Sequence, residues 1–278
     1  MRLQKKIEHN VDFISAKGSS RLNEDAFSIN KKDHVFAVFD GATSLTPFTD
    51  SSGRTGAYRA SNIAKEVFDM GGADLNSLVL KTNAKMRAEM LEEGIDIGDK
   101  LNLWGTTAAA VKIYNDRFNW LQISDTNIIV IYKDGSSKFL VENNGHDSKT
   151  LARLKSFIDG GSKNPTGEIM PYLIEQRRRL NVAYGVIAGE ESVNFIKTGS
   201  ESLEGVKALL IFSDGMMIPQ STLGAPANAG QIASEYEKNG LKGWLATVRS
   251  MEDSDPDLQK YIRFKQHDDA TAIAITFK

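Results

Sequence analysis

The chain has 278 residues, of which 41% are hydrophobic and 25% are charged, as in globular proteins with a sizeable core. Its 34 basic and 36 acidic side chains give a net charge of −2, which disfavours broad electrostatic binding to nucleic acid or to an anionic membrane. The absence of cysteine excludes disulfides, iron–sulfur clusters, thiolate zinc sites and cysteine nucleophiles.

The same composition constrains metal ligands and targeting segments. The four histidines have no metal-ligand spacing, so a metal site would have to use oxygen ligands, which favours Mg²⁺ or Mn²⁺. No apolar stretch is long enough to span a bilayer, and the charged start is followed by no apolar signal-peptide core. We therefore expect a cytoplasmic protein with no membrane or nucleic-acid partner.

The first hundred residues predict three strands followed by two helices. Apolar residues favour strands at 9–16, 25–32 and 34–40. Apolar residues at helical spacing then favour helices at 51–72 and 74–94, each of which ends at glycine.

The next part predicts four strands separated by short turns, which we interpret as one antiparallel meander. A more irregular middle follows, with helices predicted near 147–158 and 170–181. The three arginines at 177–179 are interpreted as a solvated helix face, with contact to a phosphopeptide as the alternative. The four predicted strands are 105–114, 117–124, 127–135 and 136–143.

The last third returns to a strand at 207–218, helices around 230–250 and a closing strand at 270–278. Strands, paired helices, further strands, further helices and a closing strand predict an α+β fold. In such a fold, antiparallel sheets are covered by helices.

Four Asp-Gly pairs allow an internal comparison. Asp134-Gly135 and Asp159-Gly160 lie in polar segments, where Asp-Gly is typical of a turn. Asp40-Gly41 and Asp214-Gly215 instead close the apolar runs "VFAVFDG" and "ALLIFSDG". Two carboxylates delivered to strand ends in similar ways indicate a shared task.

Further acidic residues lie beside predicted strands. Several buried carboxylates in one place would repel each other unless cations neutralise them, so converging strand ends would favour a cluster of divalent metal ions. The alternative is that each aspartate occupies a separate turn, as aspartate often does. These residues are Glu24, Asp25, Asp125, Asp268 and Asp269.

Six stretches resemble, in order, the motifs of the metal-dependent PPM (PP2C-type) serine/threonine phosphatases. The resemblance extends from about Ser20 to Thr276, and six weak motifs in the family's order form a strong signal. The matching stretches are Asn23-Glu24-Asp25, "VFAVFDG" with Asp40, Gly105-Thr106-Thr107-Ala108, "SDTN" with Asp125, "LLIFSDG" with Asp214, and Asp268-Asp269-Ala270-Thr271.

The resemblance implies one PPM-type domain over residues 1–278, built as two packed antiparallel sheets flanked by helices. The segment from about 147 to 205 matches the family least and corresponds to a flap over the active site in related enzymes. The implied function is hydrolysis of phosphoserine and phosphothreonine by water activated at a binuclear Mn²⁺ or Mg²⁺ centre. The implied partner is a phosphorylated protein, in opposition to a serine/threonine kinase, and we expect a monomer.

The resemblance also implies roles for individual residues. Asp40 would bridge two metal ions, and the carbonyl of Gly41 would bind one of them. Asp214 and Asp268 would hold the other ion. The further implied ligands are Glu24 and Asp25, mostly through bound waters, and Asp125, for a weaker third ion.

The catalytic positions depart from the family pattern in three places. Ala42 stands where many members carry a histidine proposed to protonate the leaving group, and His34 and His267 are the nearest alternatives in sequence. Asp269 stands where the family carries asparagine, which adds a charge next to Asp268.

The third departure concerns the phosphate-binding arginine. Ser20 occupies its usual position and Arg21 follows one residue later. We predict that Arg21 binds the phosphate, with Arg54 as the alternative.

Two other functions are weighed against the phosphatase. Ala42 and the displaced arginine are compatible with a PPM-fold regulatory or binding module that has lost efficient catalysis. The stretch "FDGAT" also suggests a second alternative, a haloacid-dehalogenase-type phosphotransferase. That chemistry needs a nucleophilic aspartate at the position that Val38 occupies. It also needs a parallel sheet, whereas the short turns between the strands after Gly105 predict antiparallel pairing.

Overall fold

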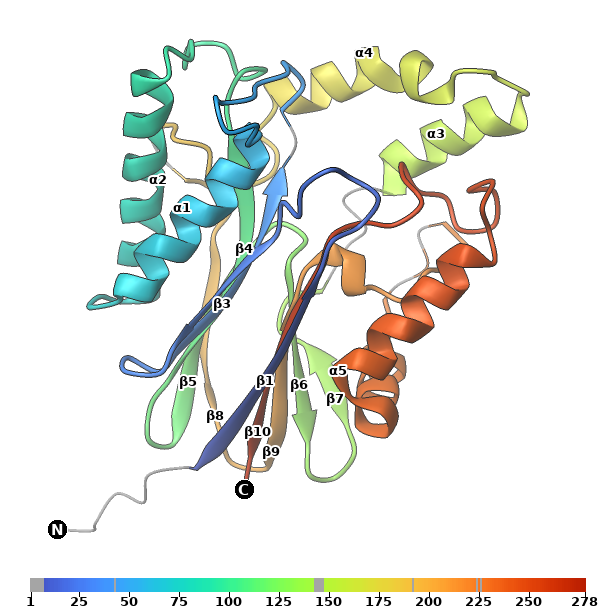
Figure 1. The fold of residues 1–278 in the computed structure, drawn as a ribbon. Helices are drawn as coiled ribbons and strands as arrows, with labels where there is room; N and C mark the ends of the chain where they lie inside the picture. Colours follow the sequence, from blue (N-terminus) through green and yellow to red (C-terminus); the bar gives the residue numbers. More distant parts are fainter. Residues whose placement is uncertain (1–7, 43, 143–147, 192, 224, 226) are drawn as a thin grey trace, which may run out of the picture.

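Two five-stranded antiparallel sheets pack face to face between helices in the computed structural model of this chain (Figure 1). The α+β sandwich that the sequence predicted is therefore confirmed. The predicted strand end at 143 and helix start at 147 lie outside the described residues. The structure describes residues 8–42, 44–142, 148–191, 193–223, 225 and 227–278.

The two sheets differ in strand order and in the helices that cover them. The first sheet has the order β2–β3–β4–β5–β8, and the second has the order β1–β10–β9–β6–β7. In the first sheet the strands are β2 (Ala26–Asn30), β3 (Val35–Ala42), β4 (Gly105–Ile113), β5 (Arg117–Ile123) and β8 (Lys197–Ser202). In the second they are β1 (His9–Ala16), β10 (Ala270–Phe277), β9 (Val206–Phe212), β6 (Asn127–Tyr132) and β7 (Ser137–Phe139).

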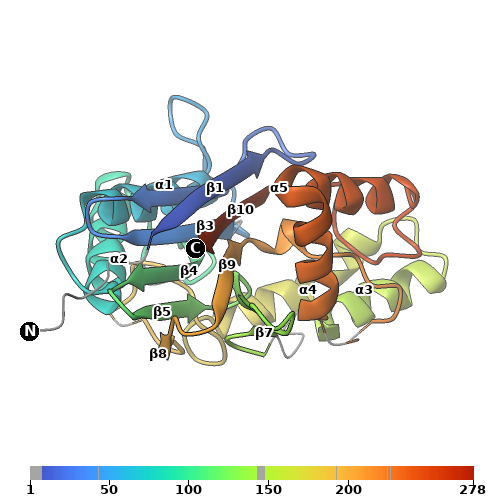
Figure 2. The same ribbon diagram turned by 90° about the horizontal axis from the view of Figure 1, so that it is seen from below.

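Helices cover the outer face of each sheet. The first sheet is covered by α1 (Gly56–Met70) and α2 (Leu75–Glu92), and the second by α5 (Ala229–Asp253), as the view along the strands shows (Figure 2). Gly240 has a φ of 64° and interrupts α5, in agreement with the plural helices predicted there. No helix in the described ranges has the length and apolar composition needed to cross a membrane.

Strand β3 shows how the sequence builds this sandwich. Ala37 and Phe39 pack under α1 and α2, whereas Phe36 and Val38 pack against the second sheet. Because side chains alternate along a strand, both faces of β3 are buried and its sequence is a continuous apolar run. The same alternation places Asp40 on the face of Phe36 and Val38, between the two sheets.

The predicted meander is wrong at one turn. Strand β5 belongs to the first sheet and pairs with β4 and β8, whereas β6 belongs to the second and pairs with β7 and β9. The chain crosses between the sheets at 124–126, where Ser124 adopts a left-handed φ of 63°. A short turn looks the same in sequence whether it forms a hairpin or changes sheet, and here it places Asp125 between the sheets.

Two elements of the middle segment differ from the prediction. The edge strand β8 was missed because its sequence, "KTGSES", is polar and mostly exposed, without the apolar alternation of a strand. Helix α4 (Pro165–Arg178) begins five residues earlier than predicted. Its N-cap Asn164 accepts a hydrogen bond from the Gly167 amide at 3.0 Å, and Pro165 is tolerated in the first turn.

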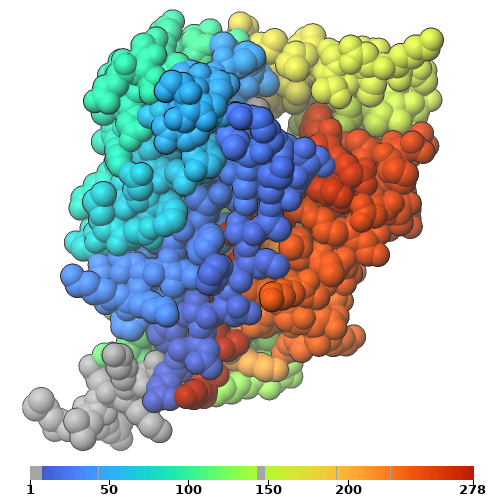
Figure 3. Space-filling model, in the orientation of Figure 1, coloured from blue at the N-terminus to red at the C-terminus, as the bar shows by residue number. Residues whose placement is uncertain are grey.

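Helices α3 (Ser148–Asp159) and α4 pack together beyond the sheet end at which β3 terminates (Figure 1). Leu154 and Ile169 form a small separate core between them with Ile262. The space-filling view shows the surface hollowed between this pair and the N-terminal segment next to it (Figure 3). Arg178 and Arg179 are exposed as predicted, but Arg177 is buried, so the interpretation of a fully solvated arginine face is wrong.

Two leucines on α2 test this packing with the same substitution. Leu78 is 0% exposed and Leu80 is 55% exposed. Leu78→Ala should lower the free energy of unfolding by about 2–5 kcal/mol because it leaves a cavity in the core. Leu80→Ala should change it by less than about 0.5 kcal/mol. Urea unfolding followed by circular dichroism measures both, and equal losses would contradict the orientation of α2.

Candidate active site

The ends of several strands bring acidic side chains to one edge of the sandwich. Asp40 lies near the end of β3, and Asp25 directly precedes β2, the neighbour of β3. In the second sheet, Asp214 follows the end of β9 and Asp268 precedes the start of the adjacent antiparallel β10. Asp125 lies in the crossing between the sheets.

Electrostatic repulsion shows how close these carboxyl groups are. Burial raises the pKa of Asp40 well above its usual range. Burial also raises the pKa of Asp214, as does the charge of Asp268, while a hydrogen bond with the Asp40 carboxyl acts in the opposite direction. The charges that further raise the pKa of Asp40 belong to Asp214, Asp25, Asp268 and Asp125. The alternative of separate turns is therefore wrong for these five residues.

Asp25 is fixed by a short chain of hydrogen bonds. The Thr271 amide donates to Ser213 Oγ at 2.9 Å, and Ser213 Oγ donates to Asp25 Oδ2 at 2.7 Å. Burial raises the pKa of Asp25 to about 7, even though these two residues stabilise the carboxylate. Its other oxygen, Oδ1, is buried without a hydrogen-bond partner among the described residues.

Asp269 positions the segment that carries Glu24. Its two carboxylate oxygens accept hydrogen bonds at 2.7 Å from the backbone amides of Gly18 and Glu24. An asparagine at this position could not accept both hydrogen bonds in this way, because its side chain has one acceptor oxygen and its other terminal group, NH2, is a donor. The Glu24 carboxylate in turn accepts a hydrogen bond from Thr55, the N-cap residue of α1.

Both glycines of the two apolar Asp-Gly pairs are required by close backbone packing. A Cβ atom on Gly41 would lie 2.7 Å from the carbonyl oxygens of Ala57 and Glu24. A Cβ atom on Gly215 would overlap the carbonyl oxygen of Asp269. These pairs are therefore places where two backbones meet at the acidic cluster, unlike Asp134-Gly135, where a Cβ atom would meet nothing.

The donor chemistry of the cluster fits hard divalent cations. Every candidate ligand is an oxygen, and Asp25 Oδ1 and Asp214 Oδ1 are buried with no hydrogen-bond partner in the described part of the chain. Within that same part, no three acidic or histidine side chains are already gathered around one point as ligands. A cation would satisfy both orphaned oxygens and remove the repulsion that raises the pKa values.

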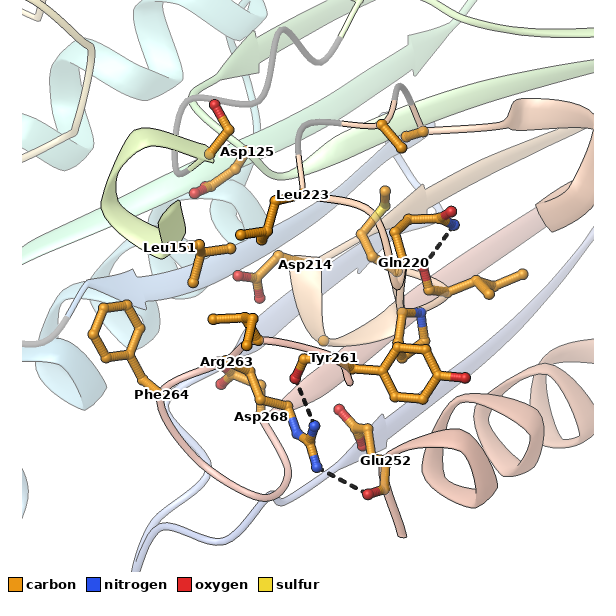
Figure 4. A pocket seen from close by; sticks show the side chains of 18 of the residues that line it. Asp125, Leu151, Asp214, Gln220, Leu223, Glu252, Tyr261, Arg263, Phe264 and Asp268 are labelled. Carbon is orange, nitrogen blue, oxygen red and sulfur yellow. Dashed lines mark hydrogen bonds between the residues drawn. The ribbon is translucent and has the colours of Figure 1, made fainter. Parts of the chain in front are cut away.

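A cavity of about 340 Å³ opens beside the cluster (Figure 4). Asp125, Asp214 and Asp268 line its polar side. Lys265 also lines it, and its Nζ lies 2.7 Å from Asp268 Oδ1. Lys265 was not among the site residues predicted from the sequence, although it lies only three residues before Asp268. The apolar lining includes Leu151, Ile218, Leu223, Tyr261, Ile262 and Phe264.

A family model described as protein phosphatase 2C matches residues 15–254. The chain belongs to the protein phosphatase 2C family. It is therefore a PPM-type serine/threonine protein phosphatase, as the sequence motifs indicated. A search of curated protein sequences gives no significant match.

Solved structures of bacterial phosphatases share the fold. The serine/threonine phosphatase PstP/Ppp of Mycobacterium tuberculosis has a TM-score of 0.60 and 16% identity, over 98% of this chain and 99% of that one. Its catalytic domain in complex with two manganese ions has a TM-score of 0.59 and 15% identity, with the same coverage. Stp1 of Staphylococcus aureus has a TM-score of 0.60 and 14% identity, over 98% of this chain and 96% of that one.

The two arginines considered for phosphate binding in this phosphatase are both engaged elsewhere. Arg21 is exposed and donates a hydrogen bond to the Gly53 carbonyl. Arg54 forms an ion pair with Asp50 at 2.7 Å. Phosphate binding by Arg21 therefore stays a prediction, and it would require Arg21 to leave Gly53.

Neither histidine is placed to protonate a leaving group. His34 precedes β3, at the end of that strand opposite to Asp40, and its ring centroid lies 5.6 Å from that of His9. The ring of His267 is held by α5: Nδ1 lies 2.8 Å from Glu252 Oε2 and Nε2 lies 3.0 Å from Asp253 Oδ1. In this structure, neither His34 nor His267 is therefore in a position to act as the proton donor.

The raised pKa values predict a distinctive pH dependence of stability in the metal-free phosphatase. Asp25, Asp40 and Asp214 keep protons when folded that the unfolded chain has lost above about pH 4. Unfolding then releases protons, so the free energy of unfolding falls as the pH rises from about 4 to about 7. For Asp25 alone the loss between pH 5 and pH 7 is about 2 kcal/mol.

Urea unfolding of the metal-free protein at pH 5, 6 and 7 measures this slope. Asp214→Asn should flatten it, because the variant removes one of the repelling charges. Asp134→Asn should leave it unchanged, because Asp134 lies in an exposed turn. A wild type that is equally stable at pH 5 and pH 7 would contradict the burial of these carboxyl groups.

Proposed function

We propose that the protein hydrolyses phosphoserine and phosphothreonine in proteins at a centre of two Mn²⁺ or Mg²⁺ ions, with a weaker third. The observation that carries this proposal is the cluster of five mutually repelling carboxyl groups beside an open cavity. The PstP catalytic domain with two manganese ions, which shares the fold, supports it. The proposed ligands are Asp40, Gly41, Asp214, Asp268, Asp25, Glu24 and Asp125.

The chain's own residues hold and shape this centre. Asp40 and Asp214 meet between the sheets, where both would hold the ions. The hydrogen bonds of Asp269 hold the segment of Glu24, and Ser213 holds Asp25. Such ions, when bound, lower the pKa of water and neutralise the oxygens of a phosphoryl group.

The apolar lining of the cavity beside the ligands would exclude bulk water and contact the substrate polypeptide. The proposed partner is a phosphorylated protein, in opposition to a serine/threonine kinase, and we infer a monomeric, cytoplasmic enzyme. A regulatory module without efficient catalysis is the second candidate. It is favoured by Ala42 at the usual histidine position and by the engagement of Arg21 with Gly53.

Metal dependence separates these two candidates. Hydrolysis of p-nitrophenyl phosphate and of phosphoserine peptides should require added Mn²⁺ or Mg²⁺ and stop in EDTA. Asp40→Asn should lower kcat by more than about 100-fold, since even residues that only orient metal ligands cost about 10–100-fold. Asp134→Asn, in the plain Asp-Gly turn, is the matched control and should keep full activity. Undiminished turnover in EDTA would end the proposal, and metal binding without turnover would favour the regulatory module.

Lys265 and Arg21 are the two candidate cations for the substrate phosphate. Lys265→Gln should raise KM for p-nitrophenyl phosphate by about 10-fold, the cost of one charge-assisted hydrogen bond. Arg21→Gln should have a smaller effect, because Lys265 lines the cavity and Arg21 is exposed. Lys207→Gln, on the surface beside Glu237, is the control. A larger effect of Arg21→Gln would show that Arg21 leaves Gly53 to bind the phosphate.

A further inference from the structure

Arg177, on α4, is buried without an ion-pair partner among the described residues. It is 7% exposed. Its Nη2 donates one hydrogen bond to the Leu103 carbonyl at 2.8 Å, and its buried Nε has no hydrogen-bond partner in the described ranges. Arginine is rarely buried unless it is paired, because taking an uncompensated charge out of water is costly.

The carboxylate of Glu190 does not compensate this charge. Burial lowers the pKa of Arg177, and the charges of Tyr184 and Glu190 oppose the shift only in part. The Glu190 carboxylate already lies 2.8 Å from Lys100 Nζ and accepts a hydrogen bond from Asn181 at 2.6 Å. The Arg177 guanidinium therefore retains binding capacity for an anion.

Arg177 faces a cavity of about 250 Å³. At about 30 Å³ for each water, this volume has room for a phosphate or carboxylate group. Asp125 and Phe264, which Figure 4 shows in the lining of the cavity beside the acidic cluster, also line this one, so the two cavities adjoin. Further polar side chains of its lining are Thr107, Ser124, Thr150, Gln176 and Tyr184.

We propose that Arg177 and this cavity bind an acidic group of the substrate polypeptide, either a carboxylate or a second phosphate, close in sequence to the phosphorylated residue. This inference rests on the proposed function, because it names a second feature of that enzyme's substrate. Guanidinium groups bind oxyanions through strong, charge-assisted hydrogen bonds, and the described residues use only one of the five N–H donors of Arg177. The bound polypeptide would pass Asp125 and Phe264 between the two cavities.

Kinetics with matched peptides test the substrate assignment. One phosphoserine peptide carries neutral residues around the phosphoserine, and the others carry a single glutamate or a second phosphoserine at neighbouring positions. Arg177→Met should raise KM for the best acidic peptide by about 10-fold or more, and leave KM for the neutral peptide within about two-fold. Arg178→Met is the control, because Arg178 is exposed on the same helix. It should leave both values unchanged.

A purely structural role of Arg177 predicts a different result. If Arg177 only fastens α4 to Leu103, Arg177→Met should lower the unfolding temperature and change the kinetics of neutral and acidic peptides equally. That outcome would overturn the proposal. Arg177→Lys, which keeps the charge but loses the guanidinium geometry, should restore part of the preference for acidic peptides.

A binding measurement keeps the test independent of activity. Inorganic phosphate and the acidic peptide, at matched ionic strength against chloride, should raise the unfolding temperature of metal-free wild type and Arg178→Met but not of Arg177→Met. Stabilisation by phosphate without any preference for acidic peptides would show a site for free anions and overturn the substrate assignment. No stabilisation of the wild type by either would overturn the anion site itself. A wild type without metal-dependent turnover would instead refute the proposed phosphatase activity, while the binding data still decide the role of Arg177.

Discussion

Repulsion between carboxyl groups buried at the interface of two sheets is the constraint on which this structure depends. Asp40 reaches that interface because the alternation of β3 gives it the same direction as Phe36 and Val38, which form the core between the sheets. Asp214 reaches it from the other sheet and contacts Asp40. Lys265 neutralises part of the charge through Asp268, and without divalent ions the buried carboxyl groups lower the rest by taking up protons. Protons and divalent ions therefore compete for the same oxygens.

The surrounding residues hold this repelling arrangement in place with neutral donors. Ser213 donates to Asp25 and two backbone amides donate to Asp269, and these neutral donors fix both carboxylates, while Lys265 forms an ion pair with Asp268. Gly41 allows the close approach of neighbouring backbone segments. Packing in the sandwich thus offsets the repulsion between the buried carboxyl groups. The resulting site would be preorganised for the proposed metal ions.

The sequence predicted the parts of this site that depend on local pattern. Asp40 and Asp214 were distinguishable from Asp134 because each closes an apolar run, and period-two alternation turns such a run into a strand buried on both faces. What the sequence could not predict depends on tertiary packing. The turn at 124–126 reads as a hairpin although it changes sheet, and the polar strand β8 has no apolar pattern. The sequence predicts that Arg177 is solvated, because its position in a helix does not show which residues from other parts of the chain pack against it.

In the proposed enzyme, the residues that would hold the metal ions and the residue that would select the substrate lie in different parts of the structure. The acidic ligands lie at the ends of paired strands, where register and close backbone contacts permit little change. Arg177 lies instead on α4, and α3 and α4 have a small core of their own. Substitutions there can reshape the cavity of Arg177 while the carboxyl cluster stays intact. Because the two cavities meet at Asp125 and Phe264, a group bound under α4 would still be held next to the proposed site of the substrate phosphate.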